Sequence, residues 1–333
     1  MKRKALTRAA AVVTAVTATA ALGALPAQAA TIGIPWRPTV LTTPSGSVGS
    51  IAGSDGKGEY TGTFTVNGVT QVVSWRGGSV QPIVRGLPAG YEGAKAADEN
   101  AAGTVVGTAD DWDSMVSRVF TLDATGFHIK DVPAGYDYVE GKAINTRGDV
   151  LGTAYKFSGT GDNVAVLWLA SGGAPVVVPH PGSRDLDDDG TILFDTNESS
   201  LWKDGVFRPL TSYPFGQAEG LSIRNGVIVG YSSTTRAAVR WSTPDSEPIA
   251  MREGAIAVSV NKAGLSVGYV PNSNPIYGNS IAWRGTTPGT LLPVSGYKWF
   301  QAQVAADDGS FAGYVGNDLI GYGVPVIWRK SAT

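Results

Sequence analysis

The chain has no cysteine and only two histidines, His128 and His180, among its 333 residues. Disulfide bonds and a lipid-modified cysteine are therefore excluded, and a zinc site of cysteine and histidine has too few ligands. After the N-terminus, no apolar run approaches the ~18 residues of a membrane span. No later stretch repeats apolar residues at i, i+3 and i+4, so we expect little helix. The chain also lacks a basic face, so we expect no nucleic-acid partner.

The N-terminus has the three parts of a secretory signal peptide. A basic start, Met1–Lys4, precedes a stretch rich in Ala, Val and Thr, and Ala27-Gln28-Ala29 forms an Ala-x-Ala cleavage site. We expect residues 1–29 to be removed and residues 30–333 to form a single secreted, extracellular β-propeller domain with no membrane span after cleavage. An uncleaved membrane anchor is the alternative. Cleavage would also remove four basic residues from a chain with a formal net charge of −2.

Glycine is abundant, with 44 residues, and many glycines fall in a five-residue phrase that recurs seven times. The phrase is a glycine, three mostly apolar residues and usually a second glycine. The leading glycines lie 36 to 54 residues apart, at Gly49, Gly103, Gly148, Gly190, Gly226, Gly264 and Gly309. A repeat of this period predicts a propeller or a solenoid.

Each phrase is followed by an aromatic anchor, which is Trp75, Phe120, Trp168, Trp202, Trp241, Trp283 or Trp328. In the third copy the residues favour four strands, at 142–144, 149–155, 164–168 and 175–178, bounded by Gly, Asn and Pro. Four short strands per copy are typical of one propeller blade.

The two ends of the chain indicate how the ring closes. The last copy stops after Trp328 without room for a fourth strand, while residues 38–43 form a surplus strand before the first copy. We therefore predict an all-β, seven-bladed β-propeller whose N-terminal strand closes the last blade. Such pairing removes exposed sheet edges, which are otherwise sites of aggregation.

The pattern Ala-x-x-Ile-Asn-x-x-Gly-x-Val-x-Gly, followed by Ala-x-x-Trp, resembles the bacterial extracellular HAF-type repeat family. Ala143-Ile144-Asn145, Gly148 and Gly152 carry the resemblance, as do residues 260–268 with Ala282-Trp283. The resemblance implies secretion and a β-propeller, and it implies no particular activity.

Several aromatic residues fall where a propeller joins one blade to the next, or joins the second strand of a blade to the third. A propeller places these connections on one face. The residues are Tyr91, Trp112, Tyr136, Tyr138, Tyr213, Tyr297 and Trp299. Tyr and Trp suit binding surfaces because they bury much area at little cost in entropy. We predict that this face binds an extracellular glycan or protein; packing of the rings between blades is the alternative.

One acidic turn suggests a cofactor. Asp185, Asp187 and Asp189, followed by Gly190, match the first half of a calcium-binding loop, but Thr196 stands where that loop needs a bidentate Glu. Calcium is therefore the one cofactor that the sequence suggests, with a solvated acidic turn as the alternative.

Candidate catalytic groups are few. Residues 264–268 match the esterase pattern G-x-S-x-G, but no histidine follows them and the repeat itself accounts for the match. Asp110, Asp111 and Asp113 are neighbouring carboxylates, which seldom converge on one substrate atom. We expect a monomeric, non-enzymatic binding module. A secreted carbohydrate-active hydrolase or lyase, or a structural cell-surface protein, remains the alternative.

Overall fold

The structure is a computed structural model that describes residues 34–44, 47–157, 163–196, 199–270, 279–317 and 323–330. The predicted signal peptide, residues 1–29, lies outside the described residues. The described residues form one compact unit. Within the described part of the chain, no helix has the length and apolar character of a membrane span.

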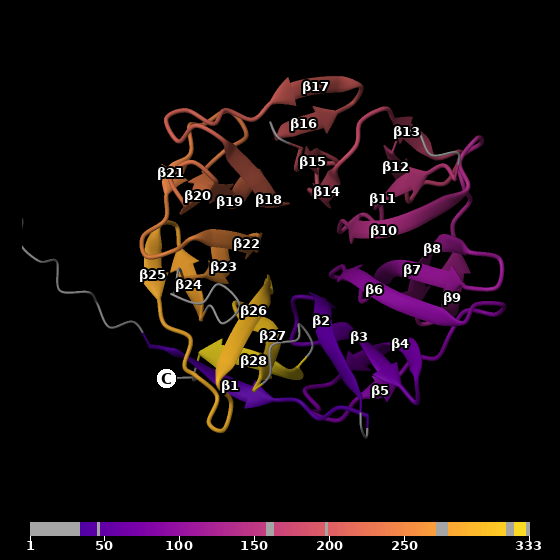
Figure 1. Cartoon of the computed structure of the whole chain (residues 1–333), viewed down its shortest axis with the longest axis horizontal. Coiled ribbons are helices and arrows are strands. Elements are labelled where there is room, and N and C mark those ends of the chain that lie inside the picture. The colour runs from indigo at the N-terminus through magenta and orange to yellow at the C-terminus, as the bar shows by residue number, and fades with distance from the viewer. Residues whose placement is uncertain are drawn as a thin grey trace, which may run out of the picture. The chain divides into compact units, whose positions relative to one another are not determined.

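Seven four-stranded antiparallel sheets form a ring of blades (Figure 1). The strands of each blade are given from the inner strand outward. The first blade is β2 (Val48–Ser54), β3 (Tyr60–Val66), β4 (Val69–Trp75) and β5 (Ile83–Val84), and the second is β6 (Gly93–Glu99), β7 (Val105–Asp111), β8 (Val116–Asp123) and β9 (Gly126–Ile129). The third is β10 (Tyr138–Ile144), β11 (Val150–Tyr155), β12 (Val164–Trp168) and β13 (Val176–Val178).

The fourth blade is β14 (Ser183–Leu186), β15 (Ile192–Phe194), β16 (Ser200–Lys203) and β17 (Val206–Pro209). The fifth is β18 (Ala218–Arg224), β19 (Val227–Ser232), β20 (Ala237–Trp241) and β21 (Ile249–Ala250). The sixth is β22 (Ile256–Val260), β23 (Leu265–Tyr269), β24 (Ser280–Arg284) and β25 (Thr287–Gly289). The seventh blade is β26 (Trp299–Ala305), β27 (Phe311–Gly316), β28 (Val324–Lys330) and β1 (Trp36–Val40).

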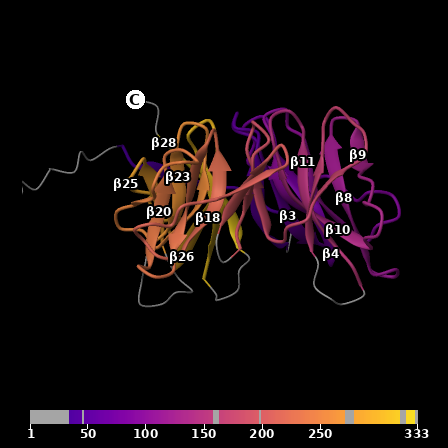
Figure 2. The same ribbon diagram turned by 90° about the horizontal axis from the view of Figure 1, so that it is seen from above.

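The predicted fold class and closure are confirmed. Strand β1 pairs with β28 from Trp36 opposite Lys330 to Val40 opposite Val326, so the N-terminal strand is the outer strand of the last blade. The closing strand is residues 36–40 rather than the predicted 38–43. The strands run between two faces of the ring, where the connections lie (Figure 2).

The second glycine of the phrase lies in the second strand of its blade, beside an irregularity in the pairing with the inner strand. In every blade the pairing of the first two strands contains a β-bulge, one extra residue in the inner strand. A Cβ on Gly268 would overlap the carbonyl oxygen of Ile256, and a Cβ on Gly313 would overlap that of Gln301. Glycine is therefore required where the second strand crosses the bulge.

The first copy of the phrase lies one strand later than the sequence suggested. Gly49 and Gly53 lie in the inner strand β2. The two glycines that match the phrase in position are Gly58, which ends the turn, and Gly62, which crosses the bulge; Gly103 and Gly107 have these places in the next blade. The assignment of Gly49 to Gly53 as the first copy was wrong because it rested on glycine spacing alone, which both strands of this blade satisfy.

In five blades the anchor tryptophan bonds to the blade before it. The indole Nε1–H donates to a backbone carbonyl after the outer strand of the preceding blade; the pairs are Trp75 to Thr42, Trp168 to Asp131, Trp241 to Thr211, Trp283 to Arg252 and Trp328 to Leu292, at 2.7–3.0 Å. The bond from Trp75 reaches the chain just after β1, so it also secures the closure of the ring. Trp202 occupies the same position and is partly buried.

In the second blade the anchor position belongs to Leu122, not Phe120. Leu122 pairs with Val105 as Trp168 pairs with Val150. Phe120 lies two residues earlier on the same side of its strand, and it is also fully buried. The sequence pattern selected the nearest aromatic residue, whereas the pairing register assigns the position to leucine.

We predict that Trp241→Ala will lower the free energy of unfolding by about 3–5 kcal/mol, because the ring is fully buried and its N–H bond to Thr211 is lost. Trp112→Ala is the matched control, since that ring is 55% exposed. It should cost less than about 1 kcal/mol. Urea denaturation of both variants measures the difference, and equal losses would contradict the role of the anchor.

Candidate functional site

Hydrogen bonds join several of the turns that follow the inner strands; we call these turns, one in each blade, the ring of turns. Asn100 Nδ2 donates to the carbonyl of Asn145 at 3.0 Å, and Asn145 Nδ2 reaches the carbonyl of Asp187 at 3.4 Å. The carboxylate of Asp187 accepts from the backbone N–H groups of Asn225 and Gly226, both at 2.7 Å. The Asn and Asp residues of the turns therefore link neighbouring blades as well as shaping their own turns.

A second set of links comes from the position just after each bulge. In four blades this residue is polar, and its side chain accepts a backbone N–H of the next inner strand. The pairs are Asp98 with Ile144, Asp185 with Ile223, Ser222 with Val260 and Ser259 with Ala305, at 2.8–3.4 Å. These bonds satisfy N–H groups that face the middle of the ring.

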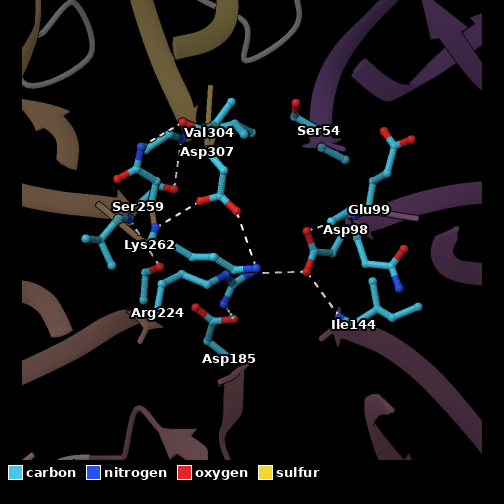
Figure 3. A pocket seen from close by; sticks show the side chains of 18 of the residues that line it. Ser54, Asp98, Glu99, Ile144, Asp185, Arg224, Ser259, Lys262, Val304 and Asp307 are labelled. Atoms are coloured by element: carbon cyan, nitrogen blue, oxygen red, sulfur yellow. Dashed lines mark hydrogen bonds and ion pairs between the residues drawn. The ribbon is translucent and has the colours of Figure 1, made fainter. Parts of the chain in front are cut away.

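The polar ends of the inner strands line a cavity of about 200 Å³ (Figure 3). Arg224, at the end of β18, extends across it. One guanidinium nitrogen lies 2.7 Å from Asp185 Oδ1, and the other lies 3.3 Å from Asp98 Oδ2. Lys262 forms a second ion-paired group, 2.9 Å from Asp188 and 3.6 Å from Asp307. We call Asp98, Asp185 and Arg224 the central brace, because they join the second, fourth and fifth blades.

Burial controls the electrostatics of the central brace. Desolvation raises the pKa of Asp98 to about 6, although the charge of Arg224 and hydrogen bonds from Ile144 and Glu99 oppose the rise. Burial also opposes the charge of Arg224, but Asp185 and Asp98 raise its pKa above the ordinary value. Because its charges already face one another, the brace is suited to holding blades together.

The structure divides the predicted calcium residues among different contacts. Asp185 belongs to the central brace and Asp187 to the ring of turns, while Asp189 accepts from the N–H of Thr191 at 2.9 Å and pairs with Lys203. Over the described residues, no group of three His, Asp or Glu side chains is placed to hold a metal ion. Calcium binding at these residues stays a prediction.

The predicted aromatic residues lie on the face opposite the ring of turns, which we call the aromatic face. Tyr138 and Trp299 begin the inner strands β10 and β26, and the others lie in connections between blades or between β7 and β8. Trp112 and Tyr213 are 55% and 68% exposed. Tyr91, Tyr136, Tyr138 and Tyr297 are partly buried. Trp299 is 5% exposed and packs edge-to-face on Tyr314 at 5.5 Å.

Two groups of these aromatic residues have close neighbours. Tyr138 stacks on Tyr155 with ring centroids 4.7 Å apart, Phe157 lies 5.3 Å from Tyr138, and Lys156 lies over Tyr136 at 5.0 Å. Tyr91 lines an open cleft with Glu92, Asp111, Asp113 and Ser114. The structure thus gives the second and the third blade one such group each, while Tyr213, Tyr297 and Trp299 belong to other blades.

The central brace was not predicted from the sequence. Asp98 and Arg224 are 126 residues apart, and each belongs to a different copy of the repeat. An alignment of the copies on their turns could have indicated the position, because Asp98 and Asp185 stand where other copies have Gly53, Ala143 and Val304. The seven copies each have a residue at this position. Only the closed fold determines which of these residues can meet a side chain from another blade across the ring.

The chain matches no protein-family model and no curated protein. Among solved structures it is similar to an oligogalacturonate lyase from Vibrio parahaemolyticus, with a TM-score of 0.59 and 11% identity over 89% of this chain and 97% of that chain. An oligogalacturonate lyase in complex with manganese has a TM-score of 0.57 and 14% identity, over 88% and 93% of the two chains.

The β-propeller domain of the Trilobed protease from Pyrococcus furiosus is also similar, with a TM-score of 0.57 and 10% identity over 89% of this chain and 94% of that chain. At such identities the similarity shows the fold alone. Because the same fold occurs in lyases and in a domain of a protease, it leaves the function open.

We predict that Asp98 makes stability depend on pH. Its folded pKa of about 6 lies above the unfolded value of ~3.9, so between these values the folded chain holds a proton that the unfolded chain has released. This contribution is full below about pH 4 and is lost as the pH rises through about 6, up to ~3 kcal/mol.

Urea denaturation from pH 4 to 7 measures this contribution as the difference in the free energy of unfolding between the unmodified protein and Asp98→Asn. Asp245→Asn is the control, because the carboxylate of Asp245 is 79% exposed in its pair with Arg208. We expect the difference for Asp98→Asn to change with pH and that for Asp245→Asn to stay small. A pH-independent difference for Asp98→Asn would overturn the prediction.

Proposed function

We propose that the chain is a secreted β-propeller that binds an extracellular glycan or protein through its aromatic face, without converting the ligand. The observation that carries the proposal is the exposure of Trp112 and Tyr213 in connections on one face. Trp and Tyr are enriched among the residues that contribute most to binding energy, so an exposed Trp and an exposed Tyr on one face support a binding role.

The surface around Trp112 supports a binding role. Its backbone N–H is held by Glu92 at 3.0 Å, and its ring lies over Gly93. Arg118 connects this region to the third blade through a 2.9 Å bond to the carbonyl of Asp137, which lies between Tyr136 and Tyr138. Aromatic rings beside polar groups can stack on sugar rings or pack on a protein while bonding their polar atoms.

The neighbouring carboxylates favour binding over hydrolysis. Asp110 is held by Lys95 at 2.9 Å and by Ser117 at 2.7 Å. Hydrogen bonds from Ser114 lower the pKa of Asp111. Glycoside hydrolysis needs one carboxyl with a raised pKa to protonate the leaving group, whereas the pKa of Asp111 is lowered.

The test is a glycan and peptide array on the purified chain, with mass spectrometry of every ligand that binds. We expect binding without products, and loss of binding of at least about tenfold in the variant that combines Trp112→Ala, Tyr136→Ala and Tyr213→Ala. Phe207→Ala, an exposed aromatic residue on the outer strand β17, is the matched control. Turnover of a ligand would favour the hydrolase or lyase, and binding by the triple variant would exclude this face.

Export is tested separately. The Ala27-Gln28-Ala29 site and the resemblance to HAF-type repeats support cleavage before Ala30 and release from the cell. Mass spectrometry of the culture medium should find a soluble chain that begins near Ala30. A full-length chain retained in the membrane would contradict the proposed export.

A further inference from the structure

The extra residue of each β-bulge differs in charge around the ring. In the third and fourth blades it is Lys142 and Arg184, whereas the other five blades have uncharged residues, Ala52, Ala97, Leu221, Val258 and Gln303. The bulge itself therefore needs no cation. Two cations in adjacent blades of a chain with a negative net charge indicate a local role for these two positions.

Both cations line one cleft. The cleft has a volume of about 450 Å³ and lies between the third and fourth blades; besides Lys142 and Arg184 its lining includes Tyr155, Asn163, Ser183 and Asp195. Tyr155 ends β11, Asn163 precedes β12, and Asp195 follows β15, so the cleft belongs to the aromatic face.

Each of the two cations pairs with a single carboxylate. Lys142 Nζ lies 3.1 Å from Glu140, and Arg184 Nη1 lies 3.5 Å from Asp195. Charge-assisted hydrogen bonds are usually about 2.7–2.9 Å long. Arg224 in the central brace, by contrast, lies 2.7 Å from Asp185 and 3.3 Å from Asp98 and so pairs with two carboxylates. Lys142 and Arg184 are also 34% and 44% exposed, so an incoming carboxylate can approach them.

An aromatic platform adjoins the cleft. Tyr155 lines the cleft and stacks on Tyr138, and Phe157, next to Tyr138, is 56% exposed. Burial and the nearby Glu140 raise the pKa of Tyr155 to about 12, so its hydroxyl stays protonated at neutral pH. Flat rings beside hydroxyl, amide and guanidinium groups match a sugar, which offers an apolar ring face and polar hydroxyls.

We propose that this cleft binds a carboxylated saccharide, with a sugar ring against the platform of Tyr138, Tyr155 and Phe157 and its carboxylate between Lys142 and Arg184. The planar guanidinium of Arg184 can hold a carboxylate through two parallel N–H bonds, which an ammonium cannot do. This inference rests on the proposed function and specifies one ligand class for the aromatic face.

Calorimetric titration of the full chain with short oligomers of hexuronic acid tests the proposal, with neutral oligomers of the corresponding hexose as the matched ligand. We expect the acidic oligomer to bind at least about tenfold more tightly, and the difference to shrink as salt is added. Equal affinities, or binding of neither oligomer, would overturn the proposal.

Variants locate the binding. Arg184→Met should weaken binding of the acidic oligomer at least about tenfold, and Arg184→Lys should restore part of the affinity, because it returns the charge without the paired N–H groups. Arg208→Met is the control, since Arg208 is similarly exposed, at 40%, on the same blade. A melting curve of each variant shows that it is folded.

The outcomes separate this inference from the proposed function. If Arg184→Met binds the acidic oligomer as the unmodified protein does, the cleft is excluded, whatever the array shows for Trp112. If another glycan or a protein binds at Trp112 while hexuronic acid oligomers do not bind, the ligand class is wrong and the aromatic face keeps its proposed role.

Discussion

In every blade, one extra residue in the inner strand forms a β-bulge, and in six blades the second strand crosses that bulge with a glycine. A side chain at Gly268 or Gly313 would overlap the inner strand, so the two strands could not pair there. The bulge also bends the strand and redirects the residues around it. The links between blades and the charges at the centre depend on this redirection.

The residues beside the bulge have different roles at the two faces. The residue after the bulge supplies bonds between blades, and at Asp98 and Asp185 it also pairs with Arg224 across the ring. Those side chains are largely buried, and Arg224 pairs with two carboxylates. The bulge residues Lys142 and Arg184 are more exposed, and each pairs with a single carboxylate. We therefore assign the brace to stability and propose the cleft on the aromatic face for binding.

Closure of the ring depends on local pairs repeated around it. Strand β1 covers the edge of β28, and Trp75 bonds to Thr42 just beyond that strand. The same tryptophan bond recurs between other neighbouring blades, for example from Trp241 to Thr211. Five of the seven blades are thus bonded in the same way to the one before them. A fold secured in this way tolerates variation in its exposed connections, where the proposed binding residues lie.

The sequence by itself determined the number of blades, the strand-rich architecture and the closing strand, because glycine turns and short apolar strands are local patterns that repeat. It located β12 at residues 164–168, as the structure has it. The sequence pattern misplaced the first copy of the phrase, and it selected Phe120 in place of Leu122. Both errors arose because the spacing of glycine and aromatic residues does not determine the register in which two strands pair.

Only the tertiary structure decided which side chains meet. Asp98 and Arg224 are 126 residues apart, and Lys142 and Arg184 share a cleft only because adjacent blades stand side by side. It also distinguished Trp112, which is exposed, from Trp299, which packs on Tyr314. Burial and pairing depend on the residues that surround a side chain in space, and in a closed ring most of those neighbours come from other copies of the repeat.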